Sequence, residues 1–325
     1  MTDALNINFF KLLFYEHPAF HRGFFCVILQ ILLQNNLNKS ALYCIIFGIT
    51  TKRRKFMSAV IPLSFWLLFA AAMLISAIGF YKYVYFISLG YGFSIAGLGS
   101  LMLYLFRDGL SAGTIIACIL FIIYGIRLGG YLLVRELKSA AYNSAMKREI
   151  KDGSTMKFGV KCAIWVTCGA LYVTQVLPVF YRLLNGKTTD GWCIAGIAIM
   201  AFGIIFESIA DMQKNASKKK NPNRFCDTGL YKLVRCPNYL GEMIFWTGVL
   251  VSGANVLEGA GQWILALIGY IGIIFVMFSG ARRLELRQNK NYGNDPEYQA
   301  YVKKVPIMVP FIPLYSVAKY KFLVA

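Results

Sequence analysis

The chain has 325 residues, of which 58% are hydrophobic and only 15% are charged, and its formal net charge is +19. Soluble domains carry about 25% charged residues, so this composition is typical of a multi-pass membrane protein and excludes an ordinary soluble domain. The excess of Lys and Arg does not indicate a nucleic-acid partner, because no zinc-finger, helix-turn-helix or aromatic-basic pattern accompanies it.

Cysteine and histidine offer no pattern for a metal site. The eight cysteines include no C-x-x-C pair, and the two histidines, His17 and His21, both lie near the N-terminus. Structural zinc needs about four such ligands at short spacings, so we expect no bound metal. The cysteines are expected to serve mainly as small apolar residues.

Residues 1–56 differ in character from the rest of the chain. Their apolar runs are too short to cross a membrane, and they end in a basic run from Lys52 to Lys55 just before Met57. They fit a signal-like leader, an extra membrane-associated hairpin, or an extension produced by a start codon upstream of the true one. We favour the third interpretation and divide the chain into an N-terminal extension, 1–56, and a membrane domain, 57–325.

From Met57 onward, apolar runs of about 20 residues recur, which is the length needed to cross the hydrocarbon core. They predict an all-α fold, a multi-pass transmembrane helical bundle of about seven spans. The predicted spans are 59–80, 84–106, 112–134, 159–181, 191–210, 239–256 and 262–280. After Gly280 we expect the helix to continue, to turn between Gly293 and Pro296, and to be followed by a second helix.

Lys and Arg gather in the linkers 135–158 and 211–238 and in the segment after Gly280, which seven spans would place on one side of the membrane. The positive-inside rule makes that side cytoplasmic, together with the C-terminus. The Lys52 to Lys55 run would then fall on the opposite side, and this conflict is the main reason to interpret residues 1–56 as an extension. We expect the bacterial inner membrane rather than the endoplasmic reticulum.

The third predicted span ends in a polar stripe. Tyr124, Arg127, Tyr131 and Arg135 recur every three or four residues and therefore share one helical face. The stripe fits a wall that contacts an anion or cofactor, and it fits equally well a belt of side chains at the membrane surface.

Acidic and amide residues concentrate between Glu207 and Glu242. Glu207 and Asp211 are four residues apart and share a helical face, while Pro237 suits a first helical position and places Asn238 and Glu242 four apart on the next helix. A carboxylate in hydrocarbon costs on the order of 3 kcal/mol in insertion measurements, so these acids are candidates for a functional site. The alternative is that they cap helices and reach the head groups.

The loop between these helices, together with the turn and the last helix, contributes basic residues that form a possible phosphate-binding basin, because Arg offers a planar fork and Lys a compact charge. The members of this basin are Lys218, Lys219, Lys220, Arg224, Lys232, Arg235, Arg282 and Arg283. Taken alone, the run of three lysines is explained by membrane orientation.

The segment G-L-Y-K-L-V-R-C-P-N-Y-L-G-E, residues 229–242, resembles the signature of the membrane steroid 5-alpha-reductase C-terminal family and its uncharacterised bacterial relatives. The preceding E-S-I-A-D-M-Q-K and the closing E-Y-Q-A-Y-V-K-K-V-P-I-M-V-P-F-I-P resemble the same family. The resemblance covers about residues 120–313. One departure is that the family's His is Cys236 here.

The resemblance implies an NADPH-dependent reductase that saturates a carbon–carbon double bond conjugated to a ketone in a steroid or other lipid. The chain lacks a G-x-G-x-x-G motif after a strand, so a Rossmann domain is not expected to bind the cofactor. The residues that the resemblance and the polar pattern assign to the cofactor are Glu207, Asp211, Lys218, Arg235, Asn238, Glu242 and Arg282 or Arg283.

The proton donor of such a reductase is not assigned by the resemblance. In the steroid reductases a Glu in a Q-E-x-P motif and a Tyr polarise the substrate carbonyl, and this chain has no Q-E-x-P. Tyr124 and Tyr131 are the candidates, because a Tyr hydroxyl in a water-poor pocket stabilises the enolate oxygen.

Two other functions stay open. Isoprenylcysteine and phospholipid methyltransferases, which use S-adenosylmethionine, also resemble the turn, but Leu230 in place of their Pro and the N-Y-x-G-E continuation favour the reductase. A non-enzymatic sterol-binding membrane protein would explain an apolar cavity, but it leaves the concentration of acids, amide and Arg at one turn unexplained.

Overall fold

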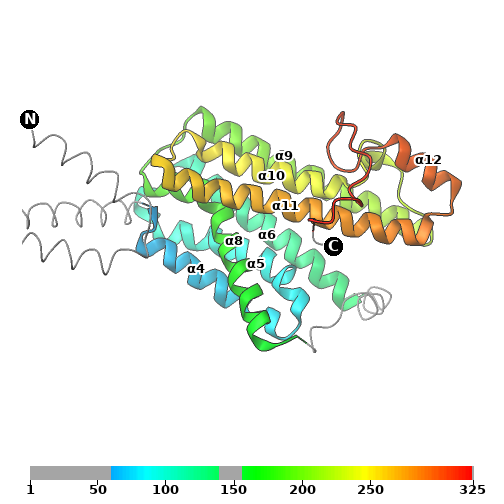
Figure 1. Cartoon of the computed structure of the whole chain (residues 1–325). Coiled ribbons are helices and arrows are strands. Elements are labelled where there is room, and N and C mark those ends of the chain that lie inside the picture. Colours follow the sequence, from blue (N-terminus) through cyan, green and yellow to red (C-terminus); the bar gives the residue numbers. More distant parts are fainter. Residues whose placement is uncertain (1–59, 139–155, 324–325) are drawn as a thin grey trace, which may run out of the picture. The chain divides into compact units, whose positions relative to one another are not determined.

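A computed structural model describes residues 60–138 and 156–323 (Figure 1). Within these residues the fold is all-helical and contains no strand, which confirms the predicted class. The interpretations of residues 1–56 lie outside the described residues. The α-helices are α4 (Leu63–Ser76), α5 (Leu89–Leu105), α6 (Ala112–Lys138), α8 (Phe158–Leu184), α9 (Gly191–Lys220), α10 (Pro237–Ala254), α11 (Gly259–Tyr292) and α12 (Pro296–Lys304).

Six helical segments of the described chain are long and apolar enough to cross a membrane, so the protein is a multi-pass helical membrane protein. They are Leu63–Phe80, Tyr83–Leu105, Ala112–Val134, Phe158–Leu184, Gly191–Lys220 and Gly259–Tyr292. The predicted span 239–256 forms α10, which falls outside this set because its first half carries Asn238 and Glu242. α10 lies beside α9 and α11, which cover part of its surface (Figure 1).

Two helices extend beyond the apolar runs that predict them. The prediction that residues 211–220 form a loop is wrong, because α9 continues to Lys220. No Gly or Pro interrupts this stretch, and its Met, Gln, Ala and Lys residues favour helix although they are not all apolar. α11 continues to Tyr292 and α12 begins at Pro296, which confirms the predicted continuation, turn and second helix.

Glycines bring the backbones of α9 and α10 into direct contact. A Cβ added to Gly203 would lie 2.6 Å from the backbone nitrogen of Phe245, and one added to Gly241 would lie 2.7 Å from the backbone nitrogen of Glu207. Small residues are common at helix interfaces in membranes, where van der Waals packing holds the helices together. This glycine seam places Glu207 directly against the first half of α10.

The same kind of contact joins α5 to α6. A Cβ on Gly92 would lie 2.7 Å from the backbone nitrogen of Gly129, and one on Gly99 would lie 2.8 Å from the carbonyl oxygen of Cys118. α6 in turn packs against α9. The two closely packed helix pairs therefore meet along α6 and α9.

Arg182 ties together three helix ends near the start of α9. Its side chain is 1% exposed, and its guanidinium donates hydrogen bonds to the Ser252 carbonyl at 2.7 Å and to Asn255 Oδ1 at 2.8 Å. It also forms an ion pair with Asp190 at 3.0 Å. Asp190 caps α9 by accepting a hydrogen bond from the Cys193 backbone N–H at 2.8 Å, so α8, α9 and α10 are held at one end.

The carboxyl group of Asp190 is strongly acidic. Partial burial acts to raise its pKa, but hydrogen bonds from Asn255, the Cys193 backbone N–H and Arg182, together with the charge of Arg182, outweigh burial and lower the pKa from 3.8 to about 2. Because the folded-state pKa lies below the unfolded one, this group stabilises the fold above about pH 4 and loses its contribution as the pH falls towards 2.

Asp190→Asn should therefore lower the midpoint of thermal unfolding in detergent by a few degrees near neutral pH, since it removes the charge that compensates Arg182. The difference between variant and wild type should shrink as the pH is lowered from about 4 towards 2, because Asp190 then takes up a proton in the unfolded chain before it does so in the folded protein. A difference that stays constant down to about pH 3 would show that the Asp190 charge does not hold this end of the bundle.

Gly203→Ala should destabilise the protein by about 1–3 kcal/mol, because the added methyl group forces α9 and α10 apart. The matched control is Gly130→Ala on α6, where an added Cβ meets nothing within 4 Å. That control should be neutral or stabilising by up to about 1 kcal/mol. Chemical unfolding of both variants in one detergent measures the difference in stability. Equal stability of the two variants would contradict the close backbone contact between α9 and α10 at Gly203.

Candidate functional site

Arg127 on α6 binds both acids of α9. Its Nη1 lies 2.7 Å from Glu207 Oε2, and its Nη2 is hydrogen bonded to Asp211 Oδ2. The Glu207 side chain is only 4% exposed. The prediction that the two acids share a helical face is confirmed, and Arg127 of the polar stripe faces acids of the protein itself.

A second set of polar groups surrounds Glu242. Tyr91 on α5 donates a hydrogen bond to Glu242 Oε1 at 2.9 Å and accepts one from Trp246 Nε1 at 2.9 Å. The Tyr124 hydroxyl on α6 lies 3.1 Å from that of Tyr91. Because Tyr91 gives its single proton to Glu242, Tyr124 is the donor in the contact between the two hydroxyls. Hydroxyl protons therefore connect Tyr124 to a buried carboxylate through Tyr91.

Aromatic packing fixes the positions of these hydroxyls. The Tyr124 ring stacks on Phe245 of α10 with centroids 4.2 Å apart and an interplanar angle of 7°. The Tyr91 ring packs against Tyr172 of α8 at 5.2 Å. Both tyrosines are buried. Side chains from α5, α6, α8 and α10 thus hold the two hydroxyls beside Glu242 away from water.

The turn before α10 is paired with the C-terminal tail, residues 305–323. The backbone N–H groups of Arg235 and Cys236 donate to the carbonyls of Pro306 and Ile307 at 2.9 and 3.0 Å. These bonds lay the tail along the start of α10.

The side chain of Arg235 is also bound to this tail. Its guanidinium is paired with Glu285 Oε1 on α11 at 3.0 Å and donates to the Tyr315 carbonyl. The other oxygen of Glu285 accepts a hydrogen bond from the Val317 N–H at 2.9 Å. The buried ion pair therefore holds the tail against α11.

Some buried polar atoms at this turn have no partner among the described residues. They are Arg235 Nε and Nη1 and Asn238 Oδ1. A buried polar atom without a partner costs about 1–3 kcal/mol, so a ligand that supplies one would be stabilising here. Asn238 follows Pro237 in the first turn of α10, where the helix dipole favours negative charge.

Cys236 occupies the position of the histidine in the family that the turn resembles. It is the N-terminal cap residue of α10 and is 1% exposed. Burial raises the pKa of its thiol to about 12. The side chain is therefore neutral at physiological pH and supplies neither a positive charge nor a base.

Several members of the expected basic basin bind groups of the protein. The Lys218 ammonium donates to the carbonyls of Pro222 and Arg224 at 3.1 and 2.6 Å, which closes the loop after α9. Arg224 pairs with Asp227 and Glu297. Carbonyl and carboxylate groups of the protein itself therefore compensate part of the positive charge of the basin.

Two further candidates also have protein partners. Arg282 donates to the Ala318 and Leu323 carbonyls of the tail, each at 3.1 Å. Tyr131 donates to Asn215 near the surface at 3.1 Å. Arg283 is exposed. The predicted site residues that the structure gathers with Arg127 and Tyr91 are Tyr124, Glu207, Asp211 and Glu242.

Sequence reasoning missed Tyr91 and Trp246. Trp246 follows Glu242 by four residues, so helical periodicity placed it on the same face and could have identified it. Tyr91 lies within G-Y-G in an apolar span, and no local pattern marks it. Its role depends on the packing of α5 and α10.

Sequence comparisons show that the chain is similar to one protein family and to one curated protein, neither of which has an assigned function. A family model described as "Protein of unknown function (DUF1295)" matches residues 56–305. The "Uncharacterized protein C594.04c" of Schizosaccharomyces pombe is 25% identical over 170 residues, which cover 43% of this chain and 48% of that protein. The chain thus spans about half the length of this relative. No solved structure matches this chain.

Arg127→Met should destabilise the protein by about 3–5 kcal/mol, because it leaves the buried Glu207 without its ion-pair partner and removes the ion pair with half-buried Asp211. The matched control is Arg107→Met, whose side chain is 67% exposed and whose contact with Asp108 is 3.8 Å long. That control should be nearly neutral. Adding Glu207→Gln to Arg127→Met should recover part of the loss in a double-mutant cycle. Equal stability of the two single variants would contradict the buried ion pair.

Proposed function

The chain belongs to the protein family of unknown function whose model covers most of its length, and from that premise we propose that it is an integral membrane reductase. Its proposed reaction is NADPH-dependent reduction of a carbon–carbon double bond conjugated to a carbonyl in a steroid or other lipid. Support comes from the resemblance of residues 207–242 and of the segment after α11 to the steroid 5-alpha-reductases.

The observation that carries the proposal is the buried series Tyr124, Tyr91 and Glu242. Reduction of a conjugated ketone places negative charge on the carbonyl oxygen, which needs a proton donor in a water-poor site. When Glu242 is protonated, the hydrogen bonds of the series run in the opposite direction, from Glu242 to Tyr91 and from Tyr91 to Tyr124. Tyr124 then gives its proton to this oxygen, Tyr91 replaces that proton, and Glu242 in turn replaces the proton of Tyr91. The carboxyl group ends as a carboxylate, and the enolate becomes an enol.

This proton series favours reduction over methyl transfer. Transfer of a methyl group to a thiolate, carboxylate or phosphate needs no proton donor at the acceptor. A methyltransferase function therefore gives no reason for two hydroxyl groups to be aligned with a buried carboxylate. A purely sterol-binding protein would also gain little from burying Glu242 with two tyrosines, since each buried polar group must be compensated.

NADPH, when bound, would supply the hydride. The unpartnered atoms at the turn before α10 and in its first turn fit its polar groups: Asn238 Oδ1 would accept from an amide or hydroxyl, and Arg235 Nε and Nη1 would each donate to a phosphate oxygen. Asp211 and Glu242, which the resemblance also assigns to the cofactor, lie on the adjoining helices. Arg235 is covered by the tail, so a phosphate reaches it only if the tail separates from the turn.

The basic residues near the site also support a membrane orientation. Lys218, Lys219 and Lys220 occupy the last turn of α9. By the positive-inside rule we expect these lysines, the site and the C-terminus on the cytoplasmic side, where NADPH is available. A bacterial inner membrane remains our expectation.

NADPH at about 100 times its dissociation constant should stabilise the purified protein in detergent by about 2.7 kcal/mol, and NADH or S-adenosylmethionine should have little effect. Asn238→Ala should abolish this thermal shift, whereas Asn291→Ala, at an exposed position of α11, should preserve it.

Three other outcomes would contradict the proposed function or the proposed cofactor site. A shift with S-adenosylmethionine alone would identify a methyltransferase. Stabilisation by sterols with no shift from either nucleotide would favour a binding protein. A normal NADPH response in Asn238→Ala would show that the cofactor lies elsewhere.

A further inference from the structure

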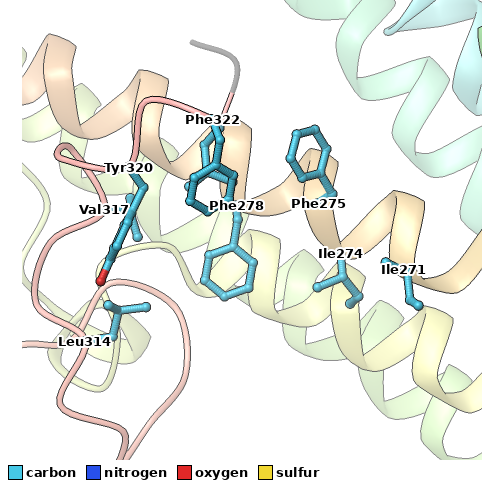
Figure 2. A pocket seen from close by; sticks show the side chains of 9 residues that line it. Ile271, Ile274, Phe275, Phe278, Leu314, Val317, Tyr320 and Phe322 are labelled. Carbon is cyan, nitrogen blue, oxygen red and sulfur yellow. The ribbon is translucent and has the colours of Figure 1, made fainter.

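An apolar groove of about 370 Å³ lies between α11 and the C-terminal tail. Figure 2 shows side chains of α11, from Ile271 to Phe278, and of the tail, from Leu314 to Phe322, around this hollow. The volume is near the lower end of the range of about 300–1,000 Å³ found for small-ligand pockets. The lining is apolar apart from the hydroxyl group of Tyr320, so the groove suits a hydrocarbon chain.

The groove continues an exposed apolar stripe on α11. Ile264, Ile268, Ile271 and Phe275 are 55%, 54%, 61% and 40% exposed and follow one another at helical spacing on one face. α11 contains a candidate membrane span, so this face meets lipid. Ile271 and Phe275 belong to both the stripe and the groove. A lipid chain that lies along the stripe can therefore extend into the groove between α11 and the tail.

The tail itself carries apolar side chains that face outward. Phe311 is 96% exposed and Phe322 is 69% exposed. The backbone of Phe311 has φ 66°, a left-handed conformation that favours Gly, yet the position holds a large aromatic residue. Large apolar side chains that are exposed at the surface favour contact with an apolar phase such as lipid. The exposed phenylalanines therefore make the tail suited to contact with the membrane surface.

Two basic residues of the tail are sequence neighbours of a residue that lines the groove. Lys319 and Lys321 are exposed and immediately precede and follow Tyr320 in the sequence, and the side chain of Tyr320 lines the groove. The whole chain has a net charge of +19. Lysines next to an apolar, membrane-facing groove complement a lipid that joins a hydrocarbon chain to a negative head group.

We propose that this groove binds one acyl chain of an anionic membrane phospholipid, with its phosphate held by Lys319 and Lys321. The lipid would fill the hollow between α11 and the tail and hold the tail at the membrane surface. The proposal requires no catalytic turnover, so it stands or falls independently of the reductase function.

The test uses the full chain in lipid nanodiscs that contain a trace of phosphatidylglycerol or phosphatidylcholine with the same photoreactive acyl chain. After irradiation, mass spectrometry maps the labelled residues. Label should appear at residues 271–278 and 314–323. Each lysine near an anionic surface favours an anionic head group roughly fivefold, so phosphatidylglycerol should label these segments at least about tenfold more strongly than phosphatidylcholine.

Ile274→Trp tests the groove by filling it. This variant should lose most of the phosphatidylglycerol label at the groove, while Ile268→Trp, on the same stripe but outside the groove, should keep it. A thermal unfolding measurement checks that both variants are folded. Undiminished labelling of Ile274→Trp would show ordinary contact with surrounding lipid and would overturn the proposal.

Replacing Lys319 and Lys321 together by Gln tests the head-group contact. Phosphatidylglycerol labelling should fall to the phosphatidylcholine level. The matched control replaces Lys303 and Lys304 of α12, which are also exposed, and should leave labelling unchanged. Equal labelling by the two lipids in the wild-type protein, or unchanged labelling after loss of Lys319 and Lys321, would overturn recognition of an anionic lipid.

Discussion

The backbone contact between α9 and α10 determines where the polar groups of this membrane protein lie. Gly203 and Gly241 leave no room for a side chain between the two helices. Glu207 and Glu242 lie beside this seam, so the close approach withdraws both from lipid at once. Arg127 from α6 then compensates the acids of α9, and Tyr91 from α5 reaches Glu242. The site is thus a consequence of how closely two helices pack.

Burial of these groups divides the polar residues into two regions. In the first, Glu207, Glu242 and Arg127 are satisfied within the protein by ion pairs and hydroxyl hydrogen bonds, an arrangement suited to holding and moving protons. In the second, at the start of α10, Arg235 and Asn238 keep buried atoms without partners. That region is suited to binding a polar ligand, and the tail covers it. The proposed reductase needs both capacities on neighbouring turns.

Sequence patterns predicted the parts of this arrangement that depend on local periodicity. Hydropathy located six spans and predicted a seventh, 239–256, which forms the more polar helix α10. The four-residue spacing placed Glu207 and Asp211 on one face, and Pro237 marked the start of α10. Hydropathy failed after Asp211, because α9 continues through charged residues with good helix propensity.

Local sequence patterns could not predict the partners of the basic residues. Lys218 and Arg282 bind backbone carbonyls that the loop and the tail present only after folding. Tyr91 enters the site through contacts among α5, α6 and α10 that no single segment encodes.

The central claim is that the Tyr124, Tyr91 and Glu242 series serves NADPH-dependent reduction of a lipid, and isotope transfer tests it most directly. Purified protein with NADPH deuterated at the hydride position should place deuterium on the β-carbon of a conjugated steroid ketone or of a lipid from a membrane extract. Tyr91→Phe should slow this transfer by about 10²–10⁴-fold, the usual contribution of a positioned proton donor, while retaining NADPH binding. Absence of deuterium from every lipid product, or an undiminished rate in Tyr91→Phe, would contradict it.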